Sequence, residues 1–281
     1  MTISSRPLQD ADLGSADAIL RLAFQTRASR VDDLQLYRRM QPDGWFVAAQ
    51  ADRLVGMVGA VNYGSLAHIG FMAVHPQSQR QGVGLALMQF LLASLDGQRL
   101  PLVTLDASPA GRPLYEKLGF IAWDETLVLQ RKGAAAGPDR PAQVQPISAL
   151  DLDELVQADA AVFGADRRKV LQVLLEVFPG RAFLQRDAQG RLAGYLFAQH
   201  DRLGPWVMLQ PGDPEALLQA ALGLPLAGTL SVTVPSVNPD ALELLQRHGF
   251  ERVRTNTHMG RGQGSRGQRE LIYSQTSLAV G

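Results

Sequence analysis

The residues best suited to chemistry lie in a polar segment that contains two glycines. An apolar run ends at Val74, Pro76 interrupts it, and Gln79–Gly84 then leads directly into a stretch with helical spacing of apolar residues. Glycine allows unusual backbone angles and a close approach to a ligand. The start of a helix offers free N–H groups and the positive end of the dipole. The segment therefore predicts a site for a diphosphate, to which Arg80 would add charge.

Two common phosphate-binding loops do not fit this segment. A P-loop ends in Gly-Lys followed by Ser or Thr, and the segment has no such ending. The dinucleotide-binding pattern needs a third glycine, which does not follow Gly82 and Gly84 at the required spacing. Taken alone, the two glycines could equally belong to an ordinary turn.

A second motif follows at a suitable distance, and the two together resemble a known family. Gln79–Gly84 (QRQGVG) resembles the Q/R-x-x-G-x-G/A pyrophosphate loop of the GNAT superfamily of N-acetyltransferases. Residues 105–120 (LDASPAGRPLYEKLGF) resemble the strand, short helix and LYxxxGF ending of that family. The resemblance implies a GNAT fold for residues 1 to about 130, with acetyl-CoA as the cofactor.

The resemblance also implies which residues hold acetyl-CoA. Backbone groups of Met72, Ala73 and Val74 would pair with the pantetheine amides in a V-shaped slot between two splayed strands. Ser108 stands where many family members carry Asn and could still donate one hydrogen bond, while Arg112 would either contact a CoA phosphate or lie in solvent. The residues expected around the pyrophosphate are Gln79, Arg80, Gln81, Gly82, Val83, Gly84 and Leu85.

Two residues are the expected catalytic groups. Tyr115 lies in the LYxxxGF motif, where a tyrosine of the family commonly protonates the departing thiolate; a phenol, with a pKa of about 10, suits that task. It could instead be a core residue that packs the helix on the sheet. Asp106, at the end of a strand that faces the slot, could be the base that deprotonates the amine or could cap the following turn. His68 and His75 are further candidates for the base, although His75 is better explained as a surface residue.

The acceptor is expected to bind near the first two helices, around Phe24 and Tyr37, and near His68. The chain has 27 Lys plus Arg and 27 Asp plus Glu, so its formal net charge is zero. This balance gives no reason to expect a nucleic acid or another strongly charged macromolecule as partner. We therefore expect a small amine or amino-acid-like metabolite as acceptor.

Composition excludes several other classes of protein. The chain has 281 residues and no cysteine, which rules out disulfides, thiolate metal sites and an acetyl-cysteine intermediate. No metal is expected. The first twenty residues show no signal pattern, and no apolar run is long enough to cross a membrane. We expect a cytoplasmic protein without membrane contact, as a monomer or a homodimer.

The chain contains an internal repeat. Asp52–Gly56 (DRLVG) is matched by Gly190–Gly194 (GRLAG), and Leu114–Phe120 (LYEKLGF) by Leu244–Phe250 (LLQRHGF). The predicted domains are residues 1–131, a GNAT domain that binds acetyl-CoA; 132–142, a linker rich in Gly, Ala and Pro; and 143–281, a GNAT-like domain.

The second copy has lost the features that bind the cofactor. Asp213 and Glu215 stand at the helix start that corresponds to the glycine loop, where they would repel a pyrophosphate, and Leu245 replaces the tyrosine. Phe163–Arg168 and His258–Gly262 resemble the C-terminal domain of a bacterial tandem-GNAT family. The Gly260–Gly267 run is expected to be a flexible loop, with a lid over a ligand as the alternative.

These observations predict an α/β (mixed α+β) protein with two tandem GNAT folds, each a mostly antiparallel sheet flanked by helices. The predicted function is transfer of an acetyl group from acetyl-CoA to a primary amine by direct attack in a ternary complex. The alternative is a non-catalytic sensor that binds acyl-CoA or a metabolite. The first predicted helix of the first copy contains Ile19–Phe24 and starts near Ser15 or Asp17. The other predicted helices are Val31–Met40, Val83–Leu95 and Gly111–Leu118, and the main strands are Trp45–Ala49, Leu54–Val61, Ala67–Val74, Leu102–Leu105 and Phe120–Val128.

Overall fold

The computed structural model describes residues 3–132, 140–209, 212–226 and 228–281. Most of the predicted linker lies outside these residues, so the predicted domain boundaries stay a prediction. The elements of the first copy are β1 (Ser4–Pro7), η1 (Asp10–Asp12), α1 (Leu13–Ala23), α2 (Val31–Met40), β2 (Trp45–Gln50), β3 (Arg53–Asn62), β4 (Leu66–Val74), η2 (Pro76–Ser78), α3 (Val83–Gly97), β5 (Leu102–Ala107), α4 (Arg112–Lys117) and β6 (Ile121–Lys132).

The second copy repeats this order, which confirms the internal repeat. Both copies begin with a short strand, a 3₁₀ turn closed by an Asp three residues into it, and two helices. The elements are β7 (Val144–Pro146), η3 (Ala149–Asp151), α5 (Leu152–Phe163), α6 (Arg168–Val177), β8 (Ala182–Arg186), β9 (Leu192–Ala198), β10 (Leu203–Met208), α7 (Pro214–Leu222), β11 (Thr229–Pro235), α8 (Pro239–Arg247) and β12 (Glu251–Gly262), followed by η4 (Arg269–Leu271) and β13 (Ile272–Ser274).

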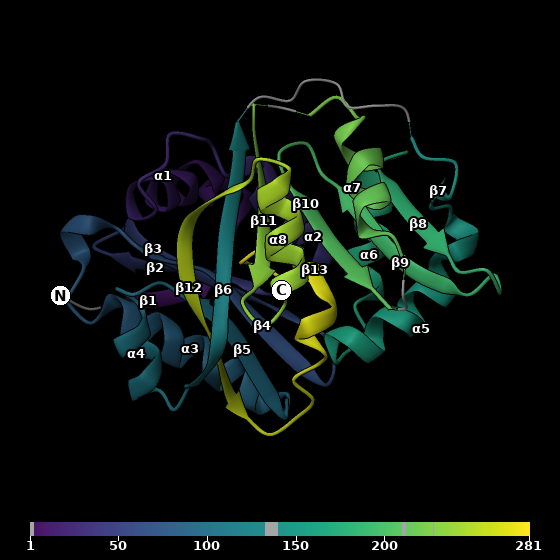
Figure 1. Cartoon of the computed structure of the whole chain (residues 1–281). Helices are drawn as coiled ribbons and strands as arrows, with labels where there is room; N and C mark the ends of the chain where they lie inside the picture. Colours follow the sequence, from purple (N-terminus) through teal and green to yellow (C-terminus); the bar gives the residue numbers. More distant parts are fainter. Residues whose placement is uncertain (1–2, 133–139, 210–211, 227) are drawn as a thin grey trace.

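The two copies exchange their last long strands. The larger sheet has the order β1-β2-β3-β4-β5-β12-β6-β11, so β12 of the second copy lies between β5 and β6 of the first. Strand β6 in turn pairs with β11, the counterpart of β5, from Thr229–Lys132 to Pro235–Thr126. Figure 1 shows β6 and β12 side by side at the centre of the molecule. Each copy therefore completes the sheet of the other.

The smaller sheet has the order β13-β10-β9-β8-β7. The first strand in this order, β13, lies between β10 and β11 of the second copy. Arg202, the residue before β10, forms one isolated parallel bridge with Ser231 of β11. Strand β13 pairs with β10 at Trp206–Ser274 and Val207–Ile272, and the amide of Gln275 donates to the Thr233 carbonyl of β11 at 2.8 Å. Strand β13 thus fills the gap between β10 and β11.

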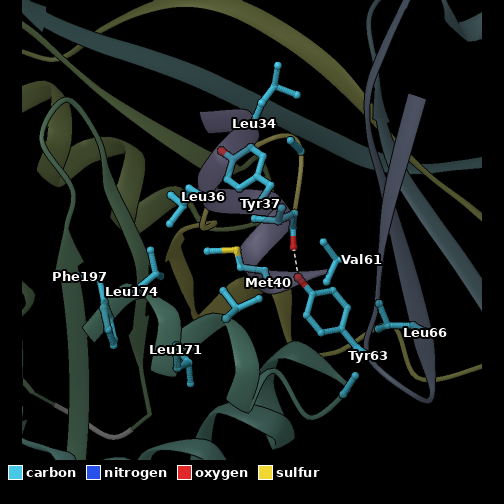
Figure 2. Packing of buried hydrophobic residues seen from close by; sticks show 14 of the residues in the cluster. Leu34, Leu36, Tyr37, Met40, Val61, Tyr63, Leu66, Leu171, Leu174 and Phe197 are labelled. Atoms are coloured by element: carbon cyan, nitrogen blue, oxygen red, sulfur yellow. Dashed lines mark hydrogen bonds between the residues drawn. The ribbon is translucent and has the colours of Figure 1, made fainter. Parts of the chain in front are cut away.

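One of the buried apolar clusters contains residues of both copies. Helices α2 and α6, one from each copy, pack against each other. Leu34, Tyr37 and Met40 of α2 belong to the same buried cluster as Leu171 and Leu174 of α6 (Figure 2). Figure 2 also shows Tyr63 between the copies, with its hydroxyl donating to the Val280 carbonyl. Because burial of apolar area stabilises a fold at about 25 cal/mol per Å², this shared cluster holds the copies together.

The prediction of a flexible loop or lid over Gly260–Gly267 is wrong for its first three residues. Gly260, Arg261 and Gly262 are the end of β12 and pair with β5. The physical reason is close packing: a Cβ at residue 260 would lie 2.0 Å from the Trp123 ring. Glycine is therefore needed here so that Trp123 can cover the strand.

No helix of the described part of the chain is both long enough and apolar enough to cross a bilayer.

Candidate active site

Strands β4 and β5 run parallel and then separate. Their pairing extends from Leu66–Leu102 to Ile69–Leu105 and ends there. Two residues further on, Phe71 has a φ of +51°, a left-handed conformation that a bulky residue rarely adopts. The β3–β4 register shifts in the same region, between Met57 and Gly59. At the end of β4, the predicted Ala73 and Val74 pair with Met57 and Gly56 of β3, while the predicted Met72 lies in the register shift. None of the three pairs with β5, so the other edge of β4 is open here.

The predicted pyrophosphate loop follows this edge. Arg80 and Gly82 have φ of +60° and +86°, and α3 begins at Val83 as predicted. These left-handed residues curl the loop so that its amides and the first turn of α3 can converge on an anion. A Cβ at Gly84 would lie 3.1 Å from Met72 Cε and 3.4 Å from Leu114 Cδ2, so this glycine lets α3 start close to both β4 and α4. These features fit a diphosphate-bearing cofactor.

The side chains of the loop mostly serve the loop itself. Gln79 Nε2 donates to the Val74 carbonyl at 3.1 Å, and Gln81 Nε2 donates to the Gln77 carbonyl at 2.8 Å. Arg80 is exposed, Val83 is buried, and Leu85 is 41% exposed. The backbone, rather than these side chains, is therefore the part of the loop suited to a ligand.

Ser108 and Arg112 lie at the surface beside α4. Ser108 Oγ accepts from the Gly111 amide at 3.2 Å. Arg112 Nε donates to Glu116 Oε1 at 2.7 Å, and both side chains are about half exposed. Contact of either residue with a cofactor stays a prediction.

Tyr115 is buried on α4 and packs edge-on against Phe120, with ring centroids 6.1 Å apart. Burial raises the pKa of its phenol above the usual value of 10. A phenol with a raised pKa stays protonated at neutral pH, as a proton donor must. The geometry is compatible with both predicted roles, as an acid and as a core residue.

Asp106 is the centre of a buried polar cluster built by both copies. Its side chain is 0% exposed, and its carboxylate accepts hydrogen bonds from Thr126 Oγ1 at 2.5 Å, His258 Nδ1 at 2.9 Å and Gln275 Nε2 at 3.3 Å. Burial favours the neutral acid, but His258, His68 and Arg269 together outweigh it and lower the pKa of Asp106 below its usual value. Asp106 is therefore an ionised carboxylate that is enclosed by protein donors.

His68 faces the same cluster from β4, with its Nε2 3.8 Å from Asp106 Oδ2. Burial lowers the pKa of His68 to about 4, so its ring is neutral at pH 7. Nδ1 lies 3.0 Å from Thr104 Oγ1, and Nε2 lies 3.3 Å from the Leu278 carbonyl oxygen. Both ring nitrogens of His68 thus have protein partners.

A small cavity of about 30 Å³ lies over this face of the sheet. His68, Thr104 and His258 line it from β4, β5 and β12, and the second copy covers it with Phe163 and Arg167. The wall is completed by Leu66, Ser265, Arg266, Arg269, Ile272, Gln275 and Gly281. The guanidinium of Arg266, which is exposed, stacks over the Trp123 ring at 4.3 Å. The cavity can hold one or two waters or a group of that size.

The predicted acceptor residues fall into two places. Phe24, which is 38% exposed, and Tyr37 both lie near Phe71, with ring centroids 6.5 and 5.3 Å away. Tyr37 is enclosed: Arg202 Nη1 donates to its hydroxyl at 3.0 Å, and Ser277 Oγ lies 2.9 Å away. Phe24 and Tyr37 thus lie around Phe71, whereas His68 faces Asp106, and contact of any of the three with an acceptor stays a prediction.

Three residues of this site were not predicted from the sequence: His258, Arg167 and Gln275. His258 and Arg167 appeared only as parts of the motifs His258–Gly262 and Phe163–Arg168. Asp166 does accept from the Arg168 amide at 2.7 Å, but Arg167 turns inward and pairs with Asp159 at 2.6 Å. Residues 254–258 are all polar, so no alternation of polar and apolar residues indicated which of them face the site.

Comparisons with known proteins agree with this architecture. The family described as "Acetyltransferase (GNAT) domain" matches residues 14–134 and again, in a second model, residues 155–274. Holothin acyltransferase of Pseudoalteromonas sp. is 26% identical over 257 residues, which are 89% of this chain and 85% of that protein. A putative acetyltransferase of Pyrococcus horikoshii superposes with a TM-score of 0.87 at 25% identity, over 99% of this chain and 96% of that one.

A tandem GNAT protein from the clavulanic acid biosynthesis pathway shares the fold. It superposes with a TM-score of 0.65 at 17% identity, over 94% of this chain and 99% of that one. The two family matches cover the two structural copies, and the tandem GNAT structure covers 94% of this chain. This chain therefore belongs to the GNAT acetyltransferase family, as a tandem GNAT protein.

Proposed function

We propose that this acyltransferase moves an acetyl group from acetyl-CoA to a primary amine of a small metabolite, with both bound at the same time. The observation that carries the proposal is the open edge of β4 beside the loop Gln79–Gly84. This edge offers backbone groups for the pantetheine arm, and the loop and the start of α3 offer N–H groups for the diphosphate. When bound, acetyl-CoA would supply an activated thioester at the point where β4 and β5 part.

The first copy is the one that would hold the cofactor. In the second copy, β13 occupies the equivalent gap, and Asp213 Oδ1 accepts from the Ala216 amide at 3.1 Å at the start of α7. One helix N–H is thus already used, and the carboxylate would repel a diphosphate. We infer one cofactor site per chain.

Tyr115 would hold the proton that the departing thiolate needs. Its raised pKa keeps that proton in place until a negative charge develops nearby. With no cysteine in the chain, no acyl-cysteine can form, so direct attack by the amine is the simpler route. The cytoplasmic location and the choice between monomer and homodimer remain part of the proposal.

The test is calorimetric titration with acetyl-CoA, followed by measurement of thiol release with a panel of primary amines. We expect one acetyl-CoA per chain and release above background with at least one amine. Saturable binding without release from any amine would contradict the enzyme and favour the sensor. Two molecules bound per chain would contradict the assignment to the first copy.

A further inference from the structure

We propose that His258, which the second copy supplies on β12, is the general base that takes the proton from the acceptor amine, and that Asp106 positions it. This inference rests on the proposed function, because it assigns a role within the same site. It gives the second copy a part in the chemistry of the first.

The contact between the two residues leaves one atom of the imidazole available. His258 Nδ1 lies 2.9 Å from Asp106 Oδ1. An ionised carboxylate only accepts hydrogen bonds, so Nδ1 must carry a proton. In the neutral ring, Nε2 then keeps its lone pair, and it has no protein partner in the described part of the chain. The ring lines the cavity, where such a lone pair could accept a proton.

The other basic groups of the cavity are already engaged. Asp106 accepts three hydrogen bonds and has no exposed side-chain surface. His68 has a partner at each ring nitrogen. Gln275 Oε1 also has no partner, but an amide oxygen is too weakly basic to hold a proton. Among the titratable bases that line this cavity in the described part of the chain, His258 is therefore the one with an unused accepting atom.

His258 is also placed next to the expected reaction centre. It pairs across the sheet with Asp106, and Asp106 directly follows Leu105, where β4 and β5 part. The cavity of about 30 Å³ suits the amino end of an acceptor rather than a whole metabolite. A base at this position lies beside an amine bound in the cavity and can accept the proton that the nitrogen loses as it attacks.

His258 and Tyr115 together account for both proton transfers of the reaction. The nitrogen of the amine forms the C–N bond as the C–S bond breaks. The proton of that nitrogen passes to His258 Nε2, and the sulfur takes the proton of Tyr115. His258 has then gained one proton and Tyr115 has lost one, and exchange with water restores both without any oxidant or reductant.

Asp106 would hold the ring in the productive tautomer and stabilise the imidazolium that forms. The rings of His68 and His258 lie nearly parallel, with centroids 6.4 Å apart, and Trp123 packs edge-on against His258. These contacts leave the ring little freedom. The ionisable groups that surround His258 are Asp106 on β5, His68 on β4, Asp124 on β6, Arg167 before α6, and Arg266 and Arg269 after β12.

The first test is the substitution His258→Asn, in which the amide keeps a donor toward Asp106 and Nε2 is lost. Because a positioned base contributes about 10²–10⁴-fold to a rate, we expect kcat to fall at least 100-fold while the Kd for acetyl-CoA stays within threefold. The acidic limb of the pH–rate profile should disappear. His200→Gln, at an exposed ring that packs on Phe178, is the matched control and should leave kcat and the profile unchanged.

The second test does not depend on activity. ¹⁵N NMR of the histidine rings in the free protein should show His258 with its proton on Nδ1, and Asp106→Asn should shift that population toward Nε2–H. The chain has five histidines, so His258→Asn assigns the signal. His258→Gln is the alternative variant if His258→Asn does not fold.

Two results would overturn the proposal: a proton on Nε2 in the wild-type protein, or a His258 variant with wild-type kcat at every pH. Both are distinct from a failure of the proposed function, in which the wild-type protein itself releases no thiol with any amine.

Discussion

The two copies differ most at the gap between the fourth and fifth strands of each. In the first copy this gap opens after the Ile69–Leu105 pair, next to a loop with two left-handed residues. In the second copy the equivalent strands, β10 and β11, are separated by β13, which hydrogen-bonds to both. The same architecture thus provides a ligand slot in one copy and a closed gap in the other.

The segment that follows β13 contacts the site of the first copy. Directly after β13, Gln275 bonds to Asp106, Ser277 lies against Tyr37, and the carbonyls of Leu278 and Val280 reach His68 and Tyr63. A Cβ at Gly70 would lie 2.3 Å from the Ala279 backbone. By filling its own gap, the second copy places a segment of backbone over the first. Loss of one slot therefore helps to shape the other.

The largest expected effect comes from removing the anchor of that segment. Arg167 is buried against Asp159 and donates to Thr276 Oγ1 at 3.1 Å, two residues after β13. Asp159→Ala would leave a buried, uncompensated guanidinium and should lower the free energy of unfolding by about 3–5 kcal/mol. Denaturant unfolding measures the change. Asp153→Ala, which removes an ion pair whose carboxylate is 88% exposed, is the control and should change stability by at most about 1 kcal/mol. Equal effects of the two variants would show that the buried pair does not anchor the fold.

The next effect is the pH dependence of stability that His68 gives to the first copy. Its pKa is about 4 in the folded protein and near 6.5 when unfolded, so the unfolded chain binds the proton first as the pH falls. Stability should therefore be complete above about pH 6.5 and decline toward pH 4, by up to about 3 kcal/mol. Urea unfolding from pH 7 to pH 4 measures the slope.

His68→Gln should reduce that slope, and His200→Gln should leave it unchanged. At the matching position of the second copy, two residues into β10, stands Pro205, which does not titrate. An identical slope in the His68 variant and the wild-type protein would contradict a neutral buried ring.

A third effect distinguishes the two copies in catalysis. Tyr115→Phe removes the proposed proton donor and retains the ring that packs on Phe120. We expect kcat to fall about 100-fold while the Kd for acetyl-CoA is unchanged. Tyr273→Phe, on β13 of the second copy, is the control and should retain full kcat. If both variants match the wild-type protein at every pH, Tyr115 is a core residue only.

The sequence predicted elements and motifs well because these depend on local patterns. Helix α2 has the predicted bounds Val31–Met40 because apolar spacing specifies it, and α3 begins at the predicted Val83, directly after Gly82. The family resemblance identified the loop and Tyr115 through short, contiguous motifs. Asp213 was likewise expected at a helix start, and it caps α7.

The long-range features could not be predicted in this way. Along β6 and β12, successive side chains point to opposite faces of the sheet whichever copy the strands pair with. Nothing local therefore indicates their exchange. His258 lies opposite Asp106 only because β12 pairs with β5, so this contact could not be predicted without the exchange. Strand β13 has three residues, Ile272–Ser274, which is too short for a periodic signal. The sequence therefore predicted the part of the site that lies in the first copy, including Asp106, but not the residues that the second copy adds.

The smallest effect is the sharpest test of the open slot. Gly82 and Gly119 have φ of +86° and +85°, and a Cβ at either would meet no atom within 4 Å. Alanine at each position should therefore cost a similar backbone strain of about 1–2 kcal/mol, and the two variants should lose similar stability. At Gly82 the strain can also be relieved by a change in loop shape, which binding would have to reverse. We expect the Kd for acetyl-CoA to rise about 5- to 30-fold in Gly82→Ala and to stay unchanged in Gly119→Ala, as measured by calorimetric titration. An equal Kd in both variants would mean that the left-handed turn at Gly82 serves the fold alone, and the difference between the two copies would then lie in the strand gap rather than in the loop.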